Sequence, residues 1–148
     1  YEEAIESFKH VIRLNPDDAK AHYNLGLAYF KSGKYEEAIK SYKQAIRINP
    51  DYRGAHANLG VVYDKLSKNE EAIESYKHVI RIDPDFRNAH YNLACRYSLL
   101  GNINKALKSL GKAVDLGFDD IKHIENDSDL DGLRDEAGYE MLINKLKR

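Results

Sequence analysis

The stretch Ala19–Tyr52, AKAHYNLGLAYFKSGKYEEAIKSYKQAIRINPDY, decides how the chain folds, because its pattern returns at a fixed interval. The pattern consists of His22, Leu25, Gly26, Tyr29, Ala38, Tyr42 and Pro50. The next copy, 34 residues on, is His56, Leu59, Gly60, Tyr63, Ala72, Tyr76 and Pro84. A third, less complete copy is His90, Leu93, Ala94, Tyr97, Ala106 and Leu110. Self-similarity at this period is the signature of a stacked helical array.

This spacing closely resembles that of the tetratricopeptide repeat (TPR) family, with histidine where that family often has tryptophan. The resemblance implies an all-α fold, a right-handed α-solenoid of stacked antiparallel helix pairs that holds a segment of another protein. It divides the chain into the second helix of a truncated repeat (1–18), three full repeats (19–52, 53–86 and 87–120, the last with a degenerate end) and C-terminal capping helices (121–148). The segment Asp129–Arg134 also resembles one that often closes bacterial TPR arrays.

The first helix of the unit carries two apolar stripes. At 100° per residue, Ala21 and Leu25 fall on one side of the helix, whereas Tyr23 and Leu27 fall nearly opposite. One stripe is enough for a helix that lies on a core. Two opposed stripes therefore predict packing on both sides, or packing on one side and a ligand on the other. The recurring glycines, such as Gly26, predict a close approach of a neighbouring helix.

Proline and glycine mark the helix ends. Asn15-Pro16-Asp17 ends the first helix, and Asp17 or Asp18 can cap the next one. Gly33 and Gly101 stand where a left-handed residue often ends a helix, whereas the middle repeat has Ser67 there and should turn less favourably. In the third repeat Gly117-Phe118 replaces the expected proline.

Composition excludes several functional classes. The formal net charge of −1 does not favour general binding to nucleic acids or anionic membranes. No run of 18 apolar residues could span a membrane. Cys95 is the only cysteine, so no internal disulfide forms, which fits a cytoplasmic location. The sequence begins without methionine, so a signal peptide would lie outside it.

An asparagine occurs once per repeat, at Asn24, Asn58 and Asn92. Each side-chain amide offers a donor and an acceptor that match a peptide backbone. The series resembles the asparagine ladder of some TPR and importin-like arrays, which implies a ladder down the inner face. Alternatively, the amides bond within or between repeats, or were copied when the repeats duplicated.

The second apolar stripe, with its polar margin, is a candidate peptide-binding groove on the concave side. With the asparagines, the candidate residues are Tyr23, Leu27, Phe30, Lys31, Val61, Asp64, Lys65, Asn88, Tyr91 and Cys95. Packing of first helix on first helix explains the same stripe equally well. TPR co-chaperones that hold the carboxylate of heat-shock proteins use a clamp of lysine, arginine and asparagine. Only Asn58 matches that clamp, so we do not expect that ligand.

We expect no metal, cofactor or catalytic site. The histidines His22, His56 and His90 lie a repeat apart, too far to share one ion, and packing roles explain them. The run Asp127-x-Asp129-x-Asp131-Gly132 matches the start of a calcium loop, but Gly138 stands where the closing glutamate belongs. Leu130 and Leu133 are better explained as anchors of the cap. No nucleophile–base set or phosphate loop occurs.

The sequence thus predicts a non-enzymatic protein-interaction module that binds an extended peptide or a helix of a partner protein. One alternative is a self-assembling or spacing array; another is a substrate-recruiting array of an enzyme whose catalytic domain lies elsewhere. In helix Tyr1–Leu14, the side chains of Ala4, Ile5, Phe8, Val11 and Ile12 cannot all be covered by one following unit. This predicts a homo-oligomer through the exposed N-terminal helix.

Overall fold

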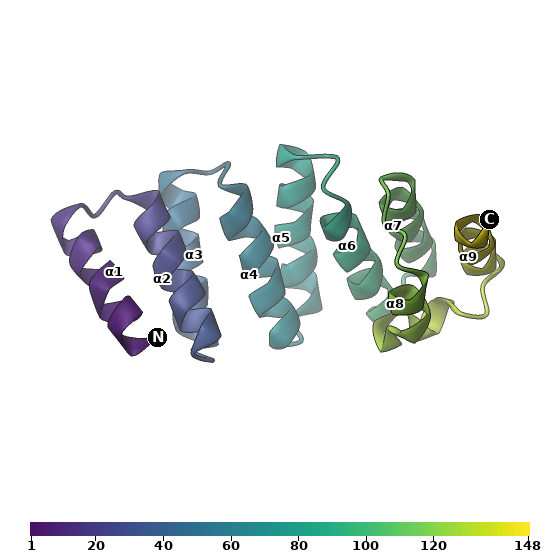
Figure 1. The fold of residues 1–148 in the computed structure, drawn as a ribbon, viewed down its shortest axis with the longest axis horizontal. Coiled ribbons are helices and arrows are strands. Elements are labelled where there is room, and N and C mark those ends of the chain that lie inside the picture. Colours follow the sequence, from purple (N-terminus) through teal and green to yellow (C-terminus); the bar gives the residue numbers. More distant parts are fainter. The chain divides into compact units, whose positions relative to one another are not determined.

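The computed structural model describes all 148 residues and consists of helices without strands, which confirms the predicted all-α class (Figure 1). It divides into two compact units, residues 1–78 and 79–148. The helices are α1 (Glu2–Leu14), α2 (Ala19–Lys31), α3 (Tyr35–Ile48), α4 (Arg53–Lys65), α5 (Asn69–Ile82), α6 (Arg87–Leu99), α7 (Ile103–Asp115), α8 (Ile121–Asn126), the 3-10 helix η1 (Ser128–Leu133) and α9 (Ala137–Lys147). Helix α5 runs through the boundary between the units.

In residues 1–78, α2 and α3 form an antiparallel pair, α1 packs on α2, and α3 packs on α4 (Figure 1). The repeated glycines allow this packing. A Cβ atom on Gly26 would lie 2.7 Å from the buried ring of Tyr42, and a Cβ on Gly60 would lie 2.6 Å from the ring of Tyr76. No side chain fits at such distances, so the glycine in each of these two repeats faces the tyrosine of its partner helix. This confirms the predicted close approach.

Helix α1 is covered in part, in agreement with the sequence prediction that not all of its apolar side chains can be buried. Ile5 is buried, and Ala4, Phe8 and Ile12 are partly buried against α2. Among the five side chains expected to be incompletely covered, Val11 is the one that the structure leaves exposed. A single neighbouring helix covers most of this face because the residues with helical spacing converge on Leu25 and Ala28.

The turns follow the predicted chemistry. Asp18 caps α2 by accepting a hydrogen bond of 3.0 Å from the backbone N–H of Ala21. Gly33 and Gly101 have φ angles of 77° and 76°, in the left-handed region that glycine adopts readily. Ser67 has a φ of 56° at the corresponding turn, the one residue other than glycine with a positive φ. The middle turn is therefore strained, as its sequence predicts.

In residues 79–148, α6 pairs with α7, η1 packs on α6, and α9 packs on α7. The short helix expected at residues 121–126 is α8. Ile124, Leu130 and Leu133 are fully buried, so the segment after α7 is held by apolar anchors. Leu130 and Leu133 thus have the packing role that the sequence indicated.

The repeated histidines have a structural role in the helix-to-helix turns. The Nε2 atoms of His22, His56 and His90 each lie 2.9 Å from a carbonyl oxygen, that of Pro16, Pro50 or Pro84 respectively. Each imidazole therefore ties the start of a first helix to the turn that precedes it. This agrees with the packing role expected for these residues.

Candidate functional site

In residues 1–78, the predicted groove residues lie on α2 and α4, two helices that contact each other. We call their shared surface the first-helix face; it comprises Tyr23, Asn24, Leu27, Phe30, Lys31, Asn58, Val61, Asp64 and Lys65. The apolar members Leu27, Phe30 and Val61 are half-buried, whereas Lys31 and Lys65 are exposed. This part of the predicted site is therefore one surface with accessible apolar atoms beside two lysines.

Tyr23 is the central aromatic residue of the first-helix face. Its ring stacks on Tyr52 with a centroid distance of 5.0 Å and lies 5.9 Å from the ring of Tyr42. Its hydroxyl accepts a hydrogen bond of 3.1 Å from the Nδ2 of Asn58. The Asn58 amide also opposes the rise in the pKa of Tyr42 that burial causes. Asn58 therefore bonds between repeats, one of the alternatives weighed for the asparagine series.

The other two asparagines differ from Asn58. Asn24 and Asn92 are half-buried, and their side chains make no hydrogen bond within the protein. An amide that is partly out of water and unbonded retains its donors and its acceptor for another molecule. The three asparagines therefore share a register but not a bonding state.

One of the polar residues at the margin of the first-helix face already bonds within the protein. Asp64 accepts a hydrogen bond of 2.5 Å from the hydroxyl of Tyr76, so its carboxylate is positioned by α5. Lys31 and Lys65, at the ends of α2 and α4, remain exposed. The accessible charge at this margin is therefore positive.

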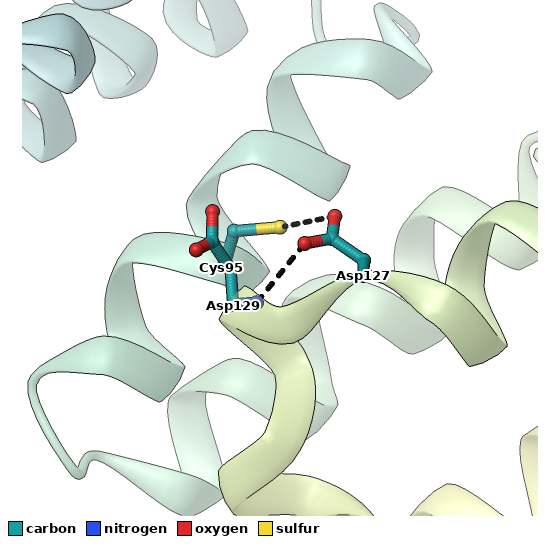
Figure 2. Close-up of side chains that lie close together, drawn as sticks. All are labelled: Cys95, Asp127 and Asp129. Carbon is teal, nitrogen blue, oxygen red and sulfur yellow. Dashed lines mark hydrogen bonds between the residues drawn. The ribbon is translucent and has the colours of Figure 1, made fainter.

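In residues 79–148, the predicted groove residues of α6 are largely covered by the segment that follows α7. Tyr91 and Cys95 are 4% and 3% exposed. The hydroxyl of Tyr91 donates to Asp127 at 2.6 Å. The thiol of Cys95 donates to the same oxygen at 3.6 Å, as Figure 2 shows. The ring of Phe118 stacks on Tyr91 at 4.3 Å with an angle of 5°. In this conformation neither Tyr91 nor Cys95 is open to a peptide.

Asn88, the remaining predicted residue, is exposed near the start of α6. It lines a hollow of about 300 Å³ together with Arg87, Phe118, Asp120 and His123. The structure therefore brings the predicted residues of α2 and α4 together on an accessible face. Of the predicted residues on α6, Asn88 is exposed and Asn92 half-buried, whereas Tyr91 and Cys95 are covered.

Sequence reasoning missed the residues that cover α6, namely Phe118, His123 and Asp127. One signal was present, because Phe118 stands at the position of the repeat where proline is expected. The ring of Phe118 stacks on Tyr91, whereas the proline at this position in the other repeats lies in the turn before the next helix. The second signal was Asp127, which the sequence presented only as part of a calcium-like motif.

The aspartates of that motif are already occupied by protein donors. Asp127 accepts from the backbone N–H of Asp129 at 3.0 Å as well as from Tyr91 and Cys95. Asp129 pairs with the buried Arg96 at 2.5 Å, and Asp131 pairs with Arg134 at 3.0 Å. Asp127 and Asp129 therefore attach η1 to α6. Asp131 bonds to Arg134, which lies at the C-terminal end of η1.

Cys95, Asp127 and Asp129 have ligand atoms within 4.8 Å of one another, close enough in principle to hold a metal ion (Figure 2). In its hydrogen bond to Asp127, however, Cys95 acts as a donor, so the thiol carries its proton. Burial, with the negative charges of Asp127 and Asp129 adding to it, raises the pKa of the Cys95 thiol well above its ordinary value. A protonated thiol is a poor metal ligand and a poor nucleophile. This cluster is best understood as the attachment of the cap.

Family models describe nearly the whole repeat region. A model described as TPR repeat matches residues 1–33 and 26–67. Two models described as tetratricopeptide repeat match residues 54–86 and 88–118. The chain belongs to the tetratricopeptide repeat family. The helix pairs, the glycine–tyrosine contacts and the period of the sequence thus have one explanation.

Solved structures of MamA are similar to this TPR chain. One crystal structure of MamA is 35% identical with a TM-score of 0.74, covering 76% of this chain and 66% of that chain. A second has 32% identity and the same TM-score, covering 84% and 66%. MamA 41-end from Desulfovibrio magneticus RS-1 is 23% identical with a TM-score of 0.78, covering 99% and 85%, and shows the shared fold. The present chain thus spans about two thirds of the first two MamA chains.

No curated protein sequence matches the chain. Each helix of the structure is too short or too polar to cross a lipid bilayer. The TPR family models support a repeat protein of the kind that interacts with other proteins.

Proposed function

We propose that the chain is a non-catalytic protein-interaction module that binds an extended peptide or a helix of a partner protein on its first-helix face. The observation that carries this proposal is the combination, on α2 and α4, of half-buried apolar side chains, exposed lysines and an unbonded amide. Apolar atoms supply most of the affinity of such a contact, and a few polar groups fix the orientation.

The residues of the first-helix face have different roles in this proposal. Tyr23, Leu27 and Phe30 contact apolar side chains of the bound segment. Asn24 bonds to its backbone, because this amide has no partner within the protein. Lys31 and Lys65 favour a segment with acidic side chains. Asn58 has a positioning role instead, since its amide holds the hydroxyl of Tyr23.

Selection of peptides from a displayed random library against the intact chain tests the proposal. We expect the selected peptides to lose about 0.5–1.5 kcal/mol of binding free energy to Asn24→Ala, which removes one neutral hydrogen bond. Leu27→Asp should abolish capture, whereas Gln44→Asp, which adds the same charge at an exposed position of α3, should leave it intact. Peptides that bind with the same affinity to Leu27→Asp and to the unchanged chain would contradict the proposal.

Self-assembly through α1 is a second candidate function. It is favoured by the exposure of Tyr1, Val11 and Leu14, which are 68%, 39% and 75% accessible. Burial of such apolar side chains against a second copy is favourable. Light scattering over a range of concentrations tests it: Leu14→Glu should reduce the average mass if α1 is the contact, and an unchanged monomer at every concentration would exclude it.

A further inference from the structure

A second surface, distinct from the first-helix face, lies between α7 and α9. Helix α7 contributes Leu107, Lys108, Gly111, Lys112 and Asp115, which share one face because they follow the spacing i, i+1, i+4, i+5 and i+8. Helix α9 contributes Gly138, Met141, Leu142 and Lys145 at i, i+3, i+4 and i+7. We call this surface the α7–α9 groove.

The α7–α9 groove has room for side chains of a partner. One hollow of about 550 Å³ is lined by residues of both helices, and an adjoining hollow of about 520 Å³ follows α7 toward Asp115. Both hollows are lined by Leu107 and Lys108, so they adjoin and together make a depression along α7, to which His90 of α6 also contributes. Its length along one helix face suits a helical segment better than a compact small molecule.

Glycines and an ion pair hold the groove in shape. A Cβ on Gly138 would lie 3.1 Å from Leu107, and a Cβ on Gly111 would lie 3.8 Å from Leu142. The two helices therefore approach closely at Gly138, whereas the distance at Gly111 is that of an ordinary contact. The ammonium of Lys145 pairs with the carboxylate of Asp115 at 2.8 Å and joins α9 to the end of α7. The groove is preformed, which reduces the entropy lost on binding.

The apolar side chains that line the groove are in part exposed. Met141 is 70% accessible, an unusual exposure for a large apolar side chain. Leu107 and Leu142 beside it are half-buried. Methionine is flexible and polarizable, and proteins use it at surfaces that bind apolar side chains of helices.

The rim of the groove is basic. Lys108, Lys112, Lys145 and Arg148 line the two hollows, and Asp115 is the acidic residue among the lining side chains. Asp115 is neutralised by Lys145. Lys108, Lys112 and Arg148 make no ion pair within the protein. An apolar floor between unpaired cations is complementary to an amphipathic helix whose polar side is acidic.

We propose that the α7–α9 groove binds an acidic amphipathic helix of a partner protein. The apolar stripe of that helix lies on Leu107, Met141 and Leu142, and its carboxylates pair with Lys108, Lys112 and Arg148. This goes beyond the function proposed above, since the groove is a second binding surface made by other helices. The chain then joins two partners, one on the first-helix face and one on the α7–α9 groove.

A designed peptide of about 18 residues provides the probe. Its leucines repeat at i, i+3, i+4 and i+7, and glutamates occupy its polar side. A matched peptide has the same leucines with lysines in place of the glutamates. We expect fluorescence anisotropy to show binding of the acidic peptide about tenfold or more tighter than that of the basic one, with a difference that shrinks as salt is added.

Variants of the protein locate the binding. Met141→Glu, at an exposed position, should weaken the acidic peptide about tenfold without loss of helicity. Lys108→Glu with Lys112→Glu should do the same. The control pair Lys40→Glu with Lys43→Glu changes the net charge equally on α3 and should have no effect. Asn24→Ala should also have none, so failure at this groove is distinguishable from failure at the first-helix face.

Several results would overturn the proposal. One is equal binding of the acidic and basic peptides. Another is acidic binding that the α3 control pair weakens as much as the α7 pair does. A third is a dimer in sedimentation experiments without peptide that Met141→Glu dissociates, because a second copy of the chain would then fill the groove.

Discussion

The Nδ2 of Asn58 donates a hydrogen bond of 3.1 Å to the hydroxyl of Tyr23, which lies one repeat earlier in the chain. The asparagine that the repeat pattern presents as a ligand-binding residue is thus tied into the protein, whereas its counterpart Asn24 is not. The same residue at the same repeat position therefore has two bonding states.

This difference predicts unequal effects of alanine on stability. Asn58→Ala should lower the free energy of unfolding by about 0.5–1.5 kcal/mol, because the Tyr23 hydroxyl loses its donor. Asn24→Ala should change it by less than about 0.5 kcal/mol. Urea denaturation of both variants measures this. In a double-mutant cycle with Tyr23→Phe, the Asn58 effect should shrink; additive effects would show that the bond contributes nothing.

The glycines of the first helices should not tolerate alanine. A methyl group on Gly26 or Gly60 would lie 2.7 or 2.6 Å from a buried tyrosine ring. Gly26→Ala and Gly60→Ala should therefore destabilise the chain by about 1–3 kcal/mol, the usual cost of overpacking. Gly111→Ala is the matched control, since its methyl group would meet Leu142 at an ordinary 3.8 Å. It should stabilise α7 by about 0.5–1 kcal/mol; a gain at Gly26 as well would refute the packing argument.

The turn at Ser67 can be improved. Its φ of 56° lies in the left-handed region, where a residue with a Cβ is strained by about 1–2 kcal/mol. Ser67→Gly relieves that strain but adds freedom to the unfolded chain, so we expect a net gain of about 0.5–1 kcal/mol. Thermal unfolding followed by circular dichroism measures it. The reciprocal change Gly33→Ser, at a φ of 77°, should lower the melting temperature.

The buried thiol predicts a loss of stability at alkaline pH. Burial raises the pKa of Cys95 above its ordinary value of 9.0, so the folded chain keeps the proton when the unfolded chain releases it. The stabilising contribution is complete below about pH 9 and is lost as pH rises further, with a slope that approaches about 1.4 kcal/mol per pH unit for one proton. The buried Tyr91 hydroxyl has a raised pKa for the same reason and adds to the loss.

Denaturant titrations at several pH values between about 8 and 10.5 measure this slope. Cys95→Ala removes the thiol and should make the curve flatter than that of the unchanged chain, whatever its effect on absolute stability. Rapid modification of Cys95 by iodoacetamide in the folded chain near neutral pH would contradict its burial under Asp127.

The sequence by itself determined the family, the helix pairs and most helix ends. The period of 34 residues places glycine opposite tyrosine in the first two full repeats, and proline, glycine and Asp18 act locally on the backbone. These signals operate within one or two repeats, so they can be recognised in the order of the residues. The anchoring role of Leu130 and Leu133 was also accessible, because the motif around them lacks its closing carboxylate.

Only the tertiary structure decided which predicted site residues are accessible. Tyr91 and Cys95 occupy the same repeat positions as residues of the first-helix face, yet Phe118 and Asp127 cover them. The α7–α9 groove likewise depends on how closely Gly138 lets α9 approach Leu107. Such contacts join residues about 25–35 positions apart through segments that do not repeat. Periodicity determines the face on which a side chain lies, but the accessibility of that face depends on which non-repeating segment packs against it.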